Sequence, residues 1–141
     1  MAVFVGIDPG VNTGLALVQD GELKVVETVN IVRAMARILA AWNQCDDEIT
    51  VVFEDARQRQ WLPRERNASE YRGKLMGAGS VKRDCEIWEE FCNVYDIKYM
   101  AIPPRAGATK WDAETFRNVT GSKGRTSNHA RDAALLVYGR K

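Results

Sequence analysis

Apolar residues recur along this chain in two different periods, which divide it into strands and helices. Residues 2–7 form a continuous apolar run, which is typical of a central strand buried on both faces. Residues 13–18 make a second strand. Asp20-Gly21 is a strong signal for a two-residue hairpin turn into a third strand, residues 22–29. The chain is therefore predicted to open with three strands joined by short turns.

The period then changes to that of a helix over residues 31–42, with Asn30 as a plausible N-cap. A β-branched run at residues 49–53 predicts a fourth strand. Because a helix crosses over before it, this strand is expected to lie parallel to the first. The helix owes its apolar stripe to Ile31, Met35, Ile38, Leu39 and Trp42.

Residues 56–67 are rich in arginine, contain Pro63 and show no period, so they are predicted to form a loop. Helical character resumes at residue 68 and continues to about residue 95. Three glycines inside this helix are expected to weaken it or to allow close contact with another helix. They are Gly73, Gly77 and Gly79.

The last third of the chain predicts a fifth strand at residues 97–102 and a short helix at 112–119. A loop at 121–127 leads into a final helix at 128–138, which three apolar residues would anchor to the sheet: Leu135, Leu136 and Val137. The order β-β-β-α-β-α-β-α-α describes a single α/β domain over residues 1–141. Its core would be a five-stranded mixed sheet flanked by helices.

Composition agrees with an ordinary globular domain, since 45% of the residues are hydrophobic and 28% are charged. The apolar stretches are too short to cross a bilayer and no leader precedes the first strand, so we expect a cytoplasmic protein without membrane contact. The three cysteines form no Cys-x-x-Cys pair, which argues against a disulfide framework or a zinc site. Cys85 and Cys92 are expected to be buried thiols on a helix face.

The net charge of +1 hides a marked asymmetry between the two parts of the chain. Residues 1–55 carry three Lys or Arg against nine Asp or Glu, whereas residues 56–141 carry seventeen against ten. Basic residues gather in residues 57–66 and again in 105–131. Either cluster alone could be a solvated surface, but two of them near acidic segments favour a polyanionic partner.

Two carboxylates end predicted strands that should be neighbours. Asp8 follows the first strand in GIDPGVNTG, where Gly10 and Gly14 would permit a tight turn, and Glu54 follows the fourth strand. Asp55 should point to the opposite face and make a salt bridge or a cap. Alone, Asp8 could mark an ordinary turn and Glu54 a solvated rim. Together they predict a site for a divalent cation, most plausibly Mg²⁺.

A further pair lies in the last helix, where His129 precedes Asp132 by three residues on one face. A lone helical histidine is more often structural than functional, but this one would approach the same sheet edge, helped by alanines at 130, 133 and 134. Two cations held by such a cluster can activate a water and stabilise a leaving oxygen in phosphoryl displacement. His129 could instead position or deprotonate the water.

Three of these segments resemble motifs of the RuvC family of Holliday-junction resolvases, within the RNase H-like superfamily. GIDPGVNTG is similar to the family's first-strand motif, FE at residues 53–54 to its glutamate, and HARDAALL to its last-helix motif. The resemblance implies that Asp8, Glu54, His129 and Asp132 are catalytic and hold Mg²⁺, with two ions per active site and Mn²⁺ able to substitute.

The same resemblance implies a homodimeric endonuclease that nicks two strands of a four-way junction and leaves 5′-phosphate and 3′-hydroxyl ends. Residues 71–88 are similar to the glycine-containing dimerisation helix, and FRNVTG at 116–121 to a DNA-contacting segment. A compact version of this kind suggests a phage or mobile-element source, acting in a bacterial or phage-infected cell. The predicted DNA-binding residues are Arg57, Arg59, Trp61, Arg64, Arg66, Lys74, Lys110, Arg117, Lys123 and Arg125.

The chain also departs from the family pattern. The Val-Thr-Gly segment runs almost directly into the final helix, and Trp61 lies further from the glutamate than the usual aromatic wedge. Trp61 could still stack on unpaired bases at a crossover. Three alternatives stay open: a related nuclease acting on RNA or ribosomal RNA ends, a non-catalytic branched-DNA binding module, and an actin-like ATPase or sugar kinase. The last lacks a second phosphate loop, an adenosine motif and the necessary length.

Overall fold

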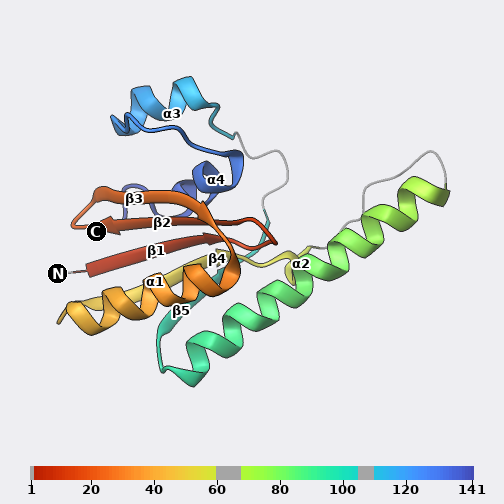
Figure 1. Cartoon of the computed structure of the whole chain (residues 1–141), viewed down its shortest axis with the longest axis horizontal. Helices are drawn as coiled ribbons and strands as arrows, with labels where there is room; N and C mark the ends of the chain where they lie inside the picture. Colours follow the sequence, from red (N-terminus) through yellow and green to blue (C-terminus); the bar gives the residue numbers. More distant parts are fainter. Residues whose placement is uncertain (1, 60–67, 105–109) are drawn as a thin grey trace.

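Five strands form one mixed sheet in the order β3-β2-β1-β4-β5 (Figure 1). The computed structural model of the chain describes residues 2–59, 68–104 and 110–141, without the side chains of Ala68, Tyr71 and Lys74. β1 pairs antiparallel with β2 and parallel with β4, which confirms the direction expected from the crossover helix. The strands are β1 Ala2–Asp8, β2 Thr13–Gln19, β3 Glu22–Val29, β4 Glu48–Glu54 and β5 Lys98–Ile102.

The predicted order of elements is confirmed, and helices cover both faces of the sheet. Figure 1 shows α1 and α2 on one face and α4 on the other, with α3 beyond it. The helices are α1 Ile31–Gln44, α2 Ala68–Val94, α3 Ala113–Thr120 and α4 Asn128–Val137, with a short 3₁₀ helix at Ala56–Gln58. Within the described residues, no helix is both long and apolar enough to cross a membrane.

Local chemistry sets the first turns as the sequence predicts. Asp20 and Gly21 both adopt positive φ, 53° and 82°, which is the conformation of the primed hairpin turn between β2 and β3. Asn30 caps α1, because its side-chain oxygen accepts a hydrogen bond from the Arg33 backbone N–H at 2.8 Å. The strands and α1 are thus fixed by turn and cap residues as well as by apolar periodicity.

Each face of the sheet has its own apolar core. On one face, α1 and α2 pack on the strands around Trp88, which is fully buried. Cys85 and Cys92 of α2 lie in this core as free thiols, and burial raises their pKa to about 11 and about 12. The expectation of buried thiols on a helix face is confirmed.

The opposite face receives α4 at unusually short range. A Cβ built at Gly6 would lie 2.1 Å from the Ala133 carbonyl oxygen, and one at Gly14 would lie 1.9 Å from that of His129. Gly14 therefore serves a close approach of backbone to backbone, not the tight turn expected from the sequence. The predicted anchors are only partly right: Val137 is buried and Leu136 packs on the cluster, but Leu135 is only partly buried.

The long helix α2 runs without a break through its glycines. Its C-terminal half packs on the sheet, whereas its N-terminal half extends beyond the sheet in Figure 1. Apart from the nearby backbone of α2 itself, no heavy atom of the described residues lies within 4 Å of a Cβ built at Gly73, Gly77 or Gly79. Leu75 and Met76 in this half are 41% and 72% exposed. This segment therefore presents small and apolar residues outside the body of the fold.

Candidate functional site

The carboxyl ends of β1 and β4 place two acidic residues at one edge of the sheet. Ile7 and Phe53 are partners in the parallel register, so Asp8 and Glu54 follow them side by side. The Asp8 side chain is 21% exposed and Glu54 is exposed. Both residues therefore lie where the sequence placed them, at adjacent strand ends, with Glu54 open to solvent and Asp8 partly buried.

The first turn of α4 brings His129 to the same edge. Its Nδ1 lies 2.9 Å from Oδ2 of Asp8, across 121 positions of sequence. Ser127 caps α4 by accepting a hydrogen bond from the Ala130 N–H at 3.1 Å, and this fixes where the first turn begins. Gly14 lets the His129 backbone approach β2 closely. The Ser127 cap and Gly14 together place the His129 imidazole beside the Asp8 carboxylate.

The charges of Asp132 and Glu54 also affect the pKa of Asp8. Burial raises the pKa of Asp8 above its ordinary value, and the negative charges of Asp132 and Glu54 raise it further. The hydrogen bond from His129 acts in the opposite direction. The other three predicted site residues thus all act on the Asp8 carboxylate, which indicates that they lie near the same end of the sheet.

A lysine completes this cluster. Nζ of Lys110 lies 3.1 Å from Oδ2 of Asp132, and their side chains are 75% and 22% exposed. The hydrogen bond to Asp132 raises the pKa of Lys110, with smaller contributions from the charges of Asp8 and Glu54. The sequence placed Lys110 among nucleic-acid contacts only. It follows a stretch without periodicity, so no pattern indicated that it would meet an acidic residue 22 positions later.

The side chains do not form a finished metal-binding shell. Among the residues that the structure describes, no three His, Cys, Asp or Glu side chains are arranged so that they could hold a metal ion. The chemistry of the donors nevertheless fits a hard divalent cation, because Asp8, Glu54 and Asp132 supply carboxylate oxygens. Burial, with smaller contributions from the charges of Asp132 and Glu54, raises the pKa of Asp8, and a bound cation would stabilise its ionised form.

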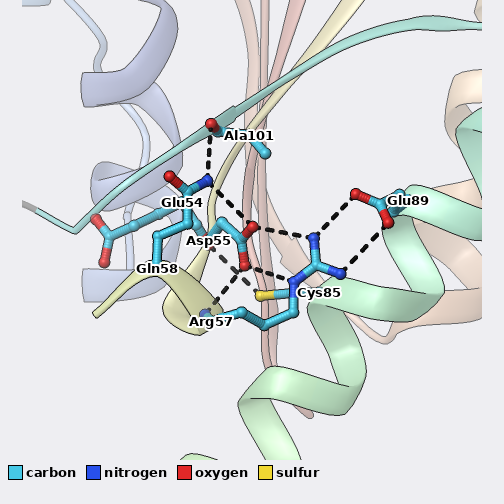
Figure 2. A network of polar contacts seen from close by, with 7 residues as sticks. All are labelled: Glu54, Asp55, Arg57, Gln58, Cys85, Glu89 and Ala101. Atoms are coloured by element: carbon cyan, nitrogen blue, oxygen red, sulfur yellow. Dashed lines mark hydrogen bonds and ion pairs between the residues drawn. The ribbon is translucent and has the colours of Figure 1, made fainter. Parts of the chain in front are cut away.

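Asp55 turns away from this cluster and serves the fold. Figure 2 shows Glu54 pointing away from the network in which Asp55 meets Arg57. Asp55 Oδ1 accepts hydrogen bonds from the backbone N–H and from Nε of Arg57, at 3.0 and 2.8 Å. It therefore caps the 3₁₀ helix and makes an ion pair, which confirms the role predicted from strand alternation.

The same network ties the end of β4 to α2. Arg57 Nη2 lies 3.0 Å from Oε2 of Glu89, and Gln58 donates to the Ala101 carbonyl at 3.2 Å (Figure 2). Burial alone would raise the pKa of Asp55, but hydrogen bonds from Arg57 and Gln58 bring it below its ordinary value. Arg57, predicted to contact DNA, is thus held by two carboxylates of its own chain.

Arg131 is a structural residue that the sequence analysis did not single out. Its side chain is buried, and it donates to the backbone carbonyls of Trp111 and Thr126 at 3.1 and 2.6 Å. It also donates to the Asn128 side chain. Arg131 therefore fixes the segment beside Lys110 against the start of α4. A buried arginine next to two site residues was visible in HARDAALL only as one more basic position.

The remaining predicted nucleic-acid contacts fall into two groups. Arg59, Arg117, Lys123 and Arg125 are exposed, the last three on α3 and the loop after it. Trp61, Arg64, Arg66 and the side chain of Lys74 lie outside the described part of the chain.

Comparison with known proteins adds no family: no family model matches the chain, and a search of curated proteins finds no match.

Proposed function

We propose that this protein is a divalent-cation-dependent endonuclease with an RNase H-like fold, similar to RuvC resolvases, that nicks four-way junctions and related branched DNA. The observation that carries the proposal is the contact of His129 with Asp8 at the sheet edge where Glu54 and Asp132 also act. His129 contacts Asp8 across 121 positions, and the charges of Asp132 and Glu54 raise the pKa of Asp8, which supports one site built from three segments. A mixed sheet with β4 parallel to β1 also supports an RNase H-like fold.

In this proposal, Asp8, Glu54 and Asp132 would hold Mg²⁺ or Mn²⁺, and His129 would complete the site. A bound cation supplies Lewis-acid stabilisation of charge on the phosphate and lowers the pKa of a bound water. When Asp8 is ionised, it accepts a hydrogen bond from Nδ1 of His129, so this nitrogen carries the proton. In the neutral imidazole Nε2 would then keep a lone pair, which would serve either to hold the cation or to accept a proton from the attacking water.

The distribution of charge supports a nucleic-acid substrate. Exposed Arg117, Lys123 and Arg125 lie on α3 and the following loop, and this loop leads directly into α4 with its site residues. Phosphate contacts from such residues would fix the position of the backbone without reading sequence. The cytoplasm of a bacterial or phage-infected cell is the proposed setting.

A homodimer is part of the proposal, since two strands of a junction need two active sites. The N-terminal half of α2 supports it, because this segment exposes Leu75 and Met76 beside three glycines that no other described element covers. Small residues allow close approach of a second helix, and the apolar side chains supply area to bury.

One assay tests the proposed activity. Synthetic four-way junctions, linear duplexes and single-stranded RNA are incubated with the protein in Mg²⁺, in Mn²⁺ and in EDTA. Paired, cation-dependent nicks in the junction with 5′-phosphate ends are expected. Cleavage of RNA alone would instead indicate an RNA-processing nuclease, and junction binding without cleavage would indicate a binding module.

A further inference from the structure

The carboxylate cluster already contains one positive charge, on Lys110. Its ammonium lies 3.1 Å from Asp132 and interacts with the charges of Asp8 and Glu54. Without it, these carboxylates would repel one another more strongly. Lys110 therefore does, within the chain, part of what a bound cation would do.

The backbone next to Lys110 is held in place by α4, the helix that carries His129 and Asp132. Arg131, which is 7% exposed, donates to the carbonyl of the next residue, Trp111, at 3.1 Å. Arg131 also belongs to α4, between His129 and Asp132. This anchor keeps the lysine within reach of Asp132, while its own side chain, at 75% exposure, is free of packing that would hold it there.

An ammonium at Oδ2 of Asp132 and a divalent cation bound to the same carboxylate repel each other, so each weakens the binding of the other. We propose that Lys110 is the counter-ion of Asp132 in the cation-free protein and that it competes with divalent cations for this carboxylate. The inference rests on the proposed function, because it assigns a role to one more residue at the proposed cation site. A cation that binds the Asp132 carboxylate has to displace the ammonium or bear its repulsion, and either opposes part of the binding free energy.

The proposal has a direct thermodynamic consequence. Replacing Lys110 by Met removes the competing charge while keeping a long apolar stem, so cation affinity should rise. A partly exposed ion pair is worth a modest free energy, which corresponds to about a two- to fivefold change in affinity. The variant should fold, because the Lys110 side chain is largely exposed.

The experiment is calorimetric titration of Mn²⁺ into the whole protein without DNA, at low ionic strength and neutral pH. K110M is compared with wild type and with K110R, which keeps the positive charge. K98M is the matched control: Lys98 makes a 2.8 Å ion pair with Glu48, with both side chains 67% exposed, at the starts of β5 and β4. That pair lies at the opposite edge of the sheet from Asp8 and Glu54.

We expect K110M to bind Mn²⁺ about two- to fivefold more tightly than wild type, K110R to stay within twofold of wild type, and K98M to stay unchanged. The rise in melting temperature on adding Mn²⁺ should also be larger for K110M. Equal or weaker binding by K110M, or an equal gain in K98M, overturns the competition and leaves the nuclease proposal to the cleavage assay. Absence of Mn²⁺ binding in all four proteins overturns both.

Discussion

Asp8 is the residue at which stability and the proposed function oppose each other. Burial and two neighbouring carboxylates raise its pKa, so the folded protein holds the Asp8 proton more tightly than the unfolded chain does. The contribution of this group to stability is therefore present at low pH and is lost as pH rises through the raised pKa. A bound cation would remove that loss.

Replacing Asp8 by Asn tests both sides of this conflict. D8N should melt at a higher temperature than wild type at pH 7 in EDTA, and the difference should shrink below the ordinary pKa of an aspartate. Junction cleavage should fall by at least about 100-fold, because a cation ligand is lost, while junction binding is kept or tightened. Melting curves and nicking assays measure the two effects.

The control is D46N, which changes an exposed aspartate near the start of β4. It should alter neither the melting temperature nor cleavage. Unchanged cleavage by D8N would remove Asp8 from the proposed site, whatever its effect on stability.

Single residues show how far sequence reasoning reaches. The opposite roles of Glu54 and Asp55 could be predicted, because successive side chains of a strand point to opposite faces. The pairing of Lys110 with Asp132 could not, since Lys110 lies outside every helix and strand. The periodicity of a helix or strand fixes the face on which each of its side chains lies, whereas no such rule holds for residues between elements.

At the scale of elements, the approach of α4 to the sheet depends on Gly14. Adding a methyl group there forces backbone to move, because the Cβ would lie 1.9 Å from the His129 carbonyl oxygen. G14A should therefore lower the free energy of unfolding by about 2–3 kcal/mol and displace His129 from Asp8. Denaturant unfolding measures the first effect, and loss of cleavage reports the second.

Gly10 offers the matched substitution in the neighbouring loop. A Cβ at this position would lie 3.5 Å from the Asn12 carbonyl oxygen, an ordinary contact, and Gly10 does not adopt positive φ. G10A should keep wild-type stability within about 0.5 kcal/mol. Equal stability of the two variants would mean that α4 does not need the close approach that the structure shows.

The junction between β4 and α2 depends on Arg57. R57M should lower the free energy of unfolding by about 2–3 kcal/mol. The reason is that it leaves the carboxylate of Asp55, which is 3% exposed, without its ion pair. The pKa of Asp55 lies below its ordinary value, so its stabilising contribution is present above the ordinary pKa and is lost as pH falls through the lowered one. The difference in free energy of unfolding between wild type and R57M should therefore become smaller at acid pH.

R83M is the comparison, since Arg83 pairs with Glu86 where both side chains are largely exposed. It should change stability by less than about 1 kcal/mol at any pH. Denaturant unfolding at neutral and acid pH would separate the two variants, and a cost for R57M no larger than for R83M would contradict the role of this network.

Element boundaries were predictable where a period begins or ends at a cap or turn, as at Asn30 and Asp20-Gly21. The 3₁₀ turn at Ala56–Gln58 was not, because it depends on Asp55 capping it and on Arg57 reaching Glu89. The glycines of α2 did not break the helix. Each glycine lowers the stability of the helix only by its poor helix propensity at an exposed position. The apolar C-terminal half, which packs on the sheet, stabilises the whole helix.

For the whole molecule, the sequence predicted strand directions better than strand order. The hairpin turns imply that β2 is antiparallel to its neighbours β1 and β3, and the crossover helix implies that β4 is parallel to β1. The place of β5 remained open, since both β3 and β4 offered an unpaired edge. Its pairing with β4 gives both strands a common direction and brings the segment after Ile102 to the edge that holds Glu54.

The exposed half of α2 leads to a prediction about the assembly and its activity. Met76 is 72% exposed on a segment that extends beyond the sheet. If this surface joins two copies, M76E buries a charge at the interface and should weaken the dimer at least about tenfold in sedimentation experiments. Val94 is 76% exposed at the other end of α2, so V94E carries the same charge without that effect.

Dissociation should change the pattern of nicks as well as their number. Each copy carries a complete set of Asp8, Glu54, His129 and Asp132, so a monomer keeps the chemistry of a single cut. On a supercoiled plasmid with an extruded four-way junction, wild type and V94E should make both nicks within one binding event and linearise the plasmid. M76E should accumulate singly nicked circles. A monomeric M76E that still linearises the plasmid as wild type does would show that paired cleavage does not depend on α2.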